Sequence, residues 1–228
     1  MEIVFIPGLI CTNQIWGELN NLRNYYQCHD ADIYHFDRIE KTSDYIIKNL
    51  PNREITVIGI SMGGYIAIDM ALKDRKKIKN LILINTTSNS VNLSTINDRM
   101  KGIELAKKGM LDEVVEMYKG ACYFQPKNEW IMLEKEMAQQ VGPDAYINQQ
   151  LSIINRTNYS EVIKNIQAKT LIISGKNDQI IPYHDSIHMF ENIPQSSLIL
   201  LNKCGHLATL EKGNFIFNII NEFLKEKR

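Results

Sequence analysis

The sequence predicts an α/β protein built on one parallel β-sheet. Six short apolar runs recur along the chain, helix-like segments separate most of them, and the runs are nearly continuous in Ile, Val and Leu. Strands that alternate with helices form parallel sheets, and strands buried on both faces have such continuous apolar sequences. We expect the six strands at residues 2–6, 31–36, 54–59, 80–85, 169–174 and 197–201.

The first run ends in a turn that predicts a functional amide. Pro7 and Gly8 directly follow the run, and a Pro-Gly pair marks a sharp turn. Such a turn directs the N–H of Leu9 above the C-terminal edge of the sheet, where parallel α/β proteins bind their ligands. An ordinary connecting turn explains the same residues equally well. Trp16, further along, is expected in the core or in a pocket wall.

The third run leads into the stretch around which the chain is organised. Residues 59–64 read Gly-Ile-Ser-Met-Gly-Gly, and a helix-patterned segment follows them. A G-x-S-x-G pentapeptide between a strand and a helix is typical of a nucleophile elbow, in which Gly59 and Gly63 allow close packing and Ser61 is strained and exposed. We therefore expect acyl transfer from Ser61, with the Met62 N–H and the helix dipole facing the developing oxyanion.

The pattern of the sequence changes after the fourth run. Residues 94–166 contain no strand pattern, but four helix-like segments at 95–108, 111–120, 127–141 and 143–156. We interpret residues 94–166 as a helical lid inserted into a core formed by residues 1–93 and 167–228. Phe124 and Trp130 are candidates for the pocket wall, although packing among the lid's own helices explains most of its apolar residues.

An acid and a histidine follow the last two runs. Asp178 comes shortly after residues 169–174, and His206 lies on the loop after residues 197–201. A buried carboxylate at Asp178 could orient His206, which would then act as a base. The order Ser61, Asp178, His206, each after a separate strand, is the order that the elbow motif requires.

Composition argues against several other classes of function. Lys plus Arg and Asp plus Glu number 26 each, so no global field favours nucleic acid or an anionic membrane. The four cysteines form no C-x-x-C pair, which argues against a zinc site and a disulfide framework and favours a reducing cytoplasm. His184 and His188 lie four residues apart, but without a third ligand at matching spacing we expect no metal. We expect neither a targeting signal nor a membrane span.

Taken together, these motifs resemble the α/β-hydrolase superfamily across nearly the whole chain. The matching stretches are residues 7–16, 59–64, 175–178 and 205–211. More narrowly, the chain is similar to small bacterial serine hydrolases and carboxylesterases whose opening turn reads Pro-Gly-Leu-Leu-Cys, here Pro-Gly-Leu-Ile-Cys. The resemblance implies the α/β-hydrolase fold with an inserted lid. Because the chain begins directly at the strand that carries this turn, we expect six parallel strands rather than the family's usual eight.

The expected function is hydrolysis of a small-molecule carboxylic ester through an acyl-enzyme, without a cofactor. Ser61, Asp178 and His206 would form the catalytic triad, and the amides of Leu9 and Met62 would form the oxyanion hole.

Two alternatives stay open. Similar small hydrolases cleave methyl esters or thioesters of chains carried by acyl carrier protein. Steering of that acidic carrier calls for a basic lid, and residues 95–164 hold nine basic and ten acidic side chains, so we do not favour this partner. Some relatives of this fold are non-catalytic ligand-binding modules, which the intact set of Ser, Asp and His argues against.

Overall fold

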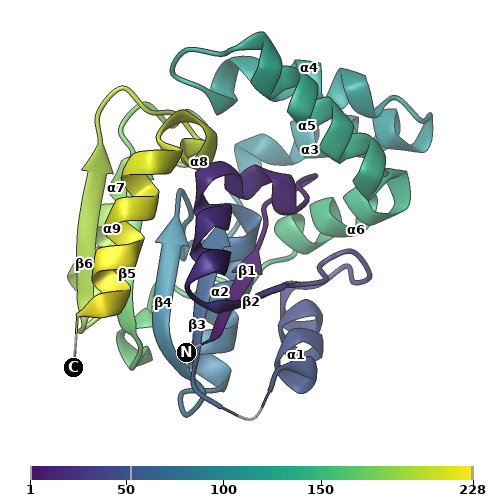
Figure 1. Cartoon of the computed structure of the whole chain (residues 1–228). Coiled ribbons are helices and arrows are strands. Elements are labelled where there is room, and N and C mark those ends of the chain that lie inside the picture. Colours follow the sequence, from purple (N-terminus) through teal and green to yellow (C-terminus); the bar gives the residue numbers. More distant parts are fainter. Residues whose placement is uncertain (1, 52, 227–228) are drawn as a thin grey trace.

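The computed structural model describes residues 2–51 and 53–226, which contain one six-stranded sheet whose strands all run parallel (Figure 1). The sheet order is β2-β1-β3-β4-β5-β6, with β1 at Glu2–Ile6, β2 at Gln27–Asp30, β3 at Ile55–Ile60, β4 at Ile78–Ile84, β5 at Lys169–Gly175 and β6 at Ser196–Leu201. The predicted fold class is therefore confirmed. Met1, Asn52, Lys227 and Arg228, which fall in the predicted core, lie outside the described residues.

The strand order creates a switch point between β1 and β3. From β1 the chain first continues outward to the edge strand β2 and then returns to form β3 on the other side of β1. Ile6 and Gly59 are partners in the register of β1 and β3, so the two C-terminal ends lie side by side. Ligands of open α/β sheets bind at such a point, outside the carboxyl ends of the strands.

The second strand lies earlier in the chain than the apolar run predicted. Residues 31–36 form a loop, and β2 pairs with β1 through residues 27–30 instead. Because β2 is an edge strand with half-buried or exposed side chains, it needs no apolar sequence and leaves no periodic signal. The apolar residues of the predicted run, Ala31 and Ile33, are buried in the core from the loop.

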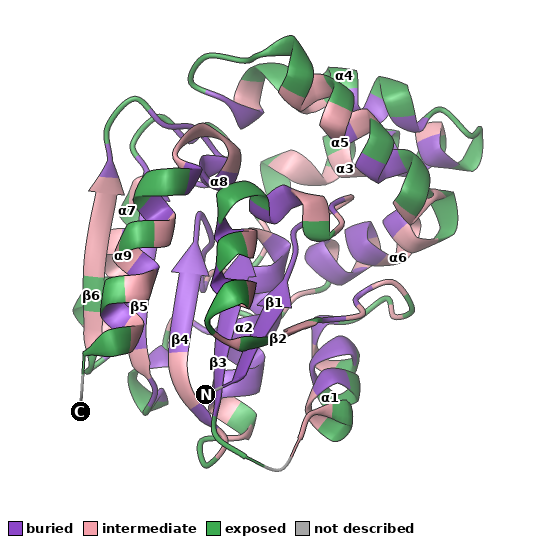
Figure 2. Cartoon of the chain, in the orientation of Figure 1, coloured by how far each residue is buried: buried purple, intermediate pink, exposed green. Residues whose placement is uncertain are grey.

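Helices cover both faces of the sheet, which explains why β1 and β3 are buried along their whole length (Figure 2). One face packs against the 3₁₀ segment η1 (Asn13–Asn24) and the helices α8 (Ala208–Glu211) and α9 (Gly213–Lys225). The other face packs against α1 (Ile39–Asn49), α2 (Met62–Lys73) and α7 (Tyr183–Asn192). Each face therefore has its own hydrophobic core.

Four helices follow β4 and lie over the end of the sheet at which the strands finish (Figure 1). They are α3 (Ile96–Lys107), α4 (Leu111–Cys122), α5 (Asn128–Val141) and α6 (Pro143–Ile154), flanked by the short turns η2 (Leu93–Thr95) and η3 (Ile163–Asn165). The N–H of Ile10, in the turn after β1, donates to Oε1 of Gln149 on α6 at 2.8 Å. The description of this segment as a separate lid stays a prediction. No helix in the described part of the chain has the length and apolarity to cross a membrane.

Candidate active site

Ser61 lies at the tight junction between β3 and α2. Its backbone has φ 52° and ψ −119°, a conformation that a side-chain-bearing residue rarely adopts. The junction is tight because strand and helix touch there: a Cβ on Gly59 would lie 2.5 Å from the carbonyl oxygen of Gly63, and a Cβ on Gly63 would lie 2.0 Å from that of Ile6. The two glycines and the strained serine therefore have the geometry expected of a nucleophile elbow.

The structure brings Ser61, His206 and Asp178 into one hydrogen-bonded chain. Nε2 of His206 lies 2.8 Å from Oγ of Ser61, and Nδ1 of His206 lies 2.7 Å from Oδ2 of Asp178. Asp178 follows β5 and His206 follows β6, so three strand ends supply the three side chains. These residues, which the sequence predicted from the elbow motif, from their places after strands and from their order, meet at the carboxyl edge of the sheet.

Two backbone amides hold the carboxylate of Asp178 in position for its contact with the histidine. Its Oδ1 accepts hydrogen bonds from the N–H groups of Ile180 at 2.8 Å and Ile181 at 2.9 Å, which leaves Oδ2 for His206. With Nδ1–H donating to this carboxylate, Nε2 of a neutral imidazole is the acceptor and can take the hydroxyl proton of Ser61. Asp178 and His206 are both buried, so water competes little for these bonds.

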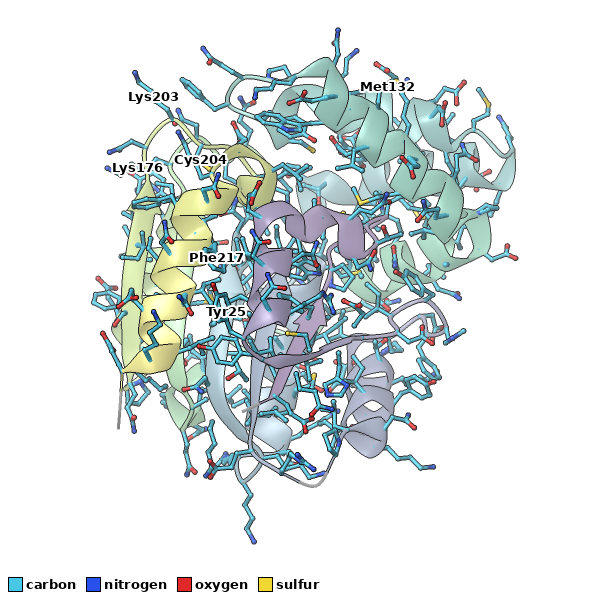
Figure 3. All side chains as sticks on the ribbon, viewed as in Figure 1. Tyr25, Met132, Lys176, Lys203, Cys204 and Phe217 are labelled. Atoms are coloured by element: carbon cyan, nitrogen blue, oxygen red, sulfur yellow. The ribbon has the colours of Figure 1, made fainter. Side chains whose placement is uncertain are left out.

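The loop that carries His206 is held by two polar side chains, Asn85 and Glu211, to which the sequence analysis gave no role. Nδ2 of Asn85 donates to the carbonyl oxygens of Gly205 at 2.7 Å and His206 at 2.5 Å, and its Oδ1 accepts from Gly175 N–H at 2.9 Å. The carboxylate of Glu211 accepts from Gly205 N–H at 2.6 Å. Figure 3 places this loop, with the labelled Lys203 and Cys204, directly beyond the end of β6.

The two predicted oxyanion donors lie beside Ser61. Met62 is the first residue of α2, a position whose N–H has no partner within the helix. Leu9 lies in the turn after β1 and lines the same cavity as Ser61. A Cβ on the intervening Gly8 would be 3.4 Å from Cβ of Ser61, which measures how closely the turn approaches the serine.

A cavity of about 100 Å³ opens beside Ser61 and His206. The core contributes the turn after β1 and the two strand-end loops, and the helices after β4 contribute the opposite wall, including Arg99, Tyr118 and Glu134. Most of the lining is apolar. The cavity can therefore hold a small, largely apolar group against the serine hydroxyl.

The three aromatic residues predicted for a pocket wall do not line this cavity. Trp16 is fully buried in the core, where its ring centroid lies 4.9 Å from that of Phe5. Trp130 stacks on Tyr123 with ring centroids 5.3 Å apart, and Phe124 is partly exposed. Aromatic content alone could not distinguish packing between elements from contact with a ligand.

One carboxyl in the cavity wall has an unusual protonation equilibrium. Glu134 is buried and accepts a hydrogen bond from the Tyr123 hydroxyl. Burial raises the pKa of Glu134 to about 7, against the opposing influence of the Tyr123 hydrogen bond and the nearby His206. The sequence offered no signal for this residue, because a single Glu in a helical segment normally faces solvent.

No cluster of three or more potential metal ligands occurs in the described residues, and the four cysteines there are unpaired. Burial raises the pKa of the Cys11 and Cys122 thiols, although both lie in the cavity wall. They are therefore protonated and poor nucleophiles near neutral pH.

Comparisons with known proteins find similar hydrolases and esterases over most of the chain. The family model described as alpha/beta hydrolase fold matches residues 24–213. A pimeloyl-[acyl-carrier protein] methyl ester esterase of Nitrosomonas europaea is 22% identical, over 92% of this chain and 90% of the relative. A thermophilic esterase from Thermogutta terrifontis, solved with malate bound, gives a TM-score of 0.89 at 21% identity, covering 99% of this chain and 89% of that one. An esterase from Exiguobacterium antarcticum gives 0.87 at 17% identity, covering 99% and 92%.

Proposed function

The chain belongs to the alpha/beta hydrolase fold family, and from this premise we propose that it hydrolyses a small-molecule carboxylic ester with Ser61 as the nucleophile. The observation that carries the proposal is the continuous chain of hydrogen bonds from Asp178 through His206 to Ser61, with distances of 2.7 and 2.8 Å. A strained serine at a strand-to-helix turn, paired with a buried His and Asp, fits acyl transfer.

In the first half of the reaction, Oγ of Ser61 attacks the ester carbonyl carbon while its proton moves to Nε2 of His206. The carbonyl oxygen becomes an oxyanion, which the amides of Leu9 and Met62 stabilise together with the positive end of the α2 dipole. Asp178 stabilises the imidazolium that forms. When the C–O bond breaks, His206 returns the proton to the leaving alcohol, and an acyl-enzyme remains on Ser61.

In the second half, His206 takes a proton from water as the water attacks the acyl-enzyme. The same amides hold the second oxyanion, and collapse of this intermediate returns the proton to Oγ of Ser61 and releases the carboxylic acid. No cofactor is needed for either half. The helices α3–α6 act as the lid over the cavity, because they supply its wall opposite Ser61.

A second candidate is hydrolysis of a methyl ester on an acyl carrier protein, which the Nitrosomonas europaea relative's name favours. The acidic carrier would need a free basic surface near the cavity entrance. On α3, however, Lys101 pairs with Asp98 at 2.9 Å and Lys107 with Glu104 at 2.8 Å. These ion pairs neutralise two of the four cations at residues 99–108, and residues 95–164 as a whole hold nine basic and ten acidic side chains, so a free ester stays the preferred substrate.

The test is an activity screen with wild type, Ser61→Ala and the control Ser90→Ala, whose serine is exposed. The panel holds short aryl esters, one methyl ester on acyl carrier protein and a fluorophosphonate probe. We expect wild type and Ser90→Ala to hydrolyse aryl esters and to take up the probe, and Ser61→Ala to lose both, since loss of a triad member costs on the order of 10⁴-fold or more.

Labelling that survives in Ser61→Ala would contradict the assignment of the nucleophile. A strong preference for the carrier-bound ester, lost at high salt, would favour the second candidate. A wild-type protein that turns over no ester and takes up no probe would instead point to a ligand-binding module.

A further inference from the structure

Arg99 gives the cavity a positive charge that the proposed triad does not use. It is the one Arg or Lys among the described residues that line the cavity, and it comes from α3, one of the helices that lie over the end of the sheet. A guanidinium has five N–H donors in a fixed fork and stays charged at any pH that an esterase meets.

The hydrogen bonds of Arg99 leave part of the guanidinium unused. Nη1 donates to Oε1 of Gln150 at 3.1 Å, but Nε is buried and has no hydrogen-bond partner among the described residues. The neighbouring acid Asp98 pairs with Lys101 instead, and no described carboxylate forms an ion pair with Arg99. The Tyr118 hydroxyl, also in the cavity wall, is buried without a partner as well. Buried donors of this kind normally find acceptors.

Neighbouring side chains hold this corner of the cavity in place. Nε2 of Gln150 donates to the Tyr146 hydroxyl at 2.7 Å. Tyr146 lies against α3 because residue 102 is Gly: a Cβ there would lie 2.3 Å from the tyrosine oxygen. The close contact of α3 and α6 therefore positions Gln150, and through it Nη1 of Arg99.

The acid of the cavity wall, Glu134, has partners other than Arg99. Glu134 interacts electrostatically with His206 and accepts a hydrogen bond from Tyr123. The positive charge of Arg99 acts instead to lower the pKa values of Tyr118, Tyr146 and Arg156. Arg156 does not compete for a ligand, since all three of its nitrogens donate to backbone carbonyls. The cavity wall thus has a cationic corner of Arg99 and Tyr118, held by Gln150, which comes from the helices after β4 rather than from the strand ends that carry the proposed reacting groups.

We propose that this corner binds a carboxylate at the far end of the substrate's acyl chain, so that the enzyme prefers half-esters of short dicarboxylic acids. The inference rests on the proposed function and names its substrate class. A carboxylate would accept from the guanidinium N–H groups that Gln150 leaves free, and Arg–carboxylate pairs are among the strong hydrogen-bonded contacts in proteins. A cavity of about 100 Å³ admits only a short chain between this carboxylate and the ester.

The test compares two methyl esters of equal shape. Monomethyl glutarate carries a carboxylate at the end of its chain, and methyl 4-nitrobutanoate carries a neutral nitro group of the same geometry at that position. We expect wild type to hydrolyse the carboxylate ester with at least about tenfold higher kcat/KM, since a hydrogen bond to a charged group contributes about 1.5–3 kcal/mol. Arg99→Met should remove this preference.

Two more variants separate loss of the contact from loss of folding or of net charge. In Gln150→Glu, an isosteric carboxylate replaces the amide that already touches Arg99, so it should occupy the guanidinium and reduce the preference as Arg99→Met does. Lys101→Met removes one positive charge from the exposed side of the same helix and should keep the wild-type ratio. Equal hydrolysis of the two esters by wild type, or an unchanged ratio in both Arg99→Met and Gln150→Glu, would overturn the inference.

Binding of both esters to Ser61→Ala, measured by calorimetry, distinguishes the two proposals. Preferential binding of monomethyl glutarate, in a protein whose wild type hydrolyses neither ester, would contradict only the proposed function. Hydrolysis by wild type without any preference in binding or rate would contradict only the carboxylate site.

Discussion

Glu134 couples the stability of the protein to pH. In the unfolded chain its carboxyl has a pKa of 4.5, and burial in the cavity wall raises this to about 7 in the folded state. Between these values the folded protein retains a proton that the unfolded chain releases. The folded state therefore loses stability as pH rises from 4.5 to about 7, and the difference between the two pKa values corresponds to about 3 kcal/mol.

The substitution Glu134→Gln should stabilise the protein at alkaline pH. Glutamine keeps an oxygen for the Tyr123 hydroxyl but cannot ionise, so the loss of stability with pH disappears. We expect urea unfolding to give a variant more stable than wild type by about 3 kcal/mol at pH 8, and nearly equal to it at pH 4.5. Glu129→Gln, exposed on the same helix, should show no such pH-dependent difference. A constant difference between wild type and Glu134→Gln at both pH values would contradict this assignment.

At the scale of single residues, the sequence predicted those site residues that belong to a motif or follow the end of a strand. Ser61, Asp178 and His206 each follow a recognisable apolar run, so the topology of a parallel sheet already implied that they meet. Asn85 also stands at the end of an apolar run, but nothing in the sequence indicates what it binds, and Glu134 follows no such run. Both side chains matter because they are buried and bonded to groups that only the folded chain brings close. Asn85, for example, forms hydrogen bonds with Gly175 and Gly205, which lie 90 or more residues away in the sequence.

At the scale of elements, the contact between α2 and β1 limits what residue 63 can be. A Cβ on Gly63 would lie 2.0 Å from the carbonyl oxygen of Ile6 and 2.6 Å from that of Pro7, and both are backbone atoms that cannot rotate away. The elbow helix would therefore have to move from the strand that carries the predicted oxyanion turn. This contact links the position of Ser61 to that of Leu9.

We expect Gly63→Ala and Gly120→Ala to change stability in opposite directions. Gly63→Ala should destabilise by about 1–3 kcal/mol or more, as overpacking of a core does. Gly120 lies near the end of α4 with nothing within 4 Å of its ideal Cβ, so alanine there should stabilise by about 0.5–1 kcal/mol through helix propensity. Thermal unfolding measures both, at roughly 2–4 °C per kcal/mol for a chain of this size. A Gly63→Ala protein as stable as wild type would show that the helix can shift freely.

The edge strand β2 was the least predictable strand from sequence. Central strands such as β3 are buried on both faces and have a continuous apolar sequence, which made them recognisable. The strand β2 has the sequence Gln-Cys-His-Asp, because one side of an edge strand faces solvent. The prediction placed the strand at the apolar residues Ala31 and Ile33, which lie in a loop and pack into the core.

At the scale of the whole molecule, the cavity is bounded by two parts of the chain that meet only in the fold. The sheet supplies the proposed reacting groups at its carboxyl edge, and the helices α3–α6 close the space above them. A cavity of about 100 Å³ is smaller than the roughly 150 Å³ known to hold a benzene ring, so the acyl group must be small unless the helices move.

This size predicts a dependence of rate on acyl-chain length. We expect kcat/KM for p-nitrophenyl acetate and butyrate to exceed that for the octanoate by about tenfold or more, since each methylene outside the cavity gains no burial and long chains displace the helices. A profile that rises steadily to the octanoate would mean that the helices open readily and that the closed cavity does not set the substrate.

The central claim is that Ser61 carries the acyl group during turnover. The most direct measurement is mass spectrometry of protein quenched in acid during hydrolysis of p-nitrophenyl acetate, followed by peptide mapping. The account predicts an acetyl group on the peptide that contains Ser61, present in wild type and in Ser90→Ala and absent from Ser61→Ala. An acetyl group on any other residue during turnover, or turnover that persists in Ser61→Ala, would contradict it.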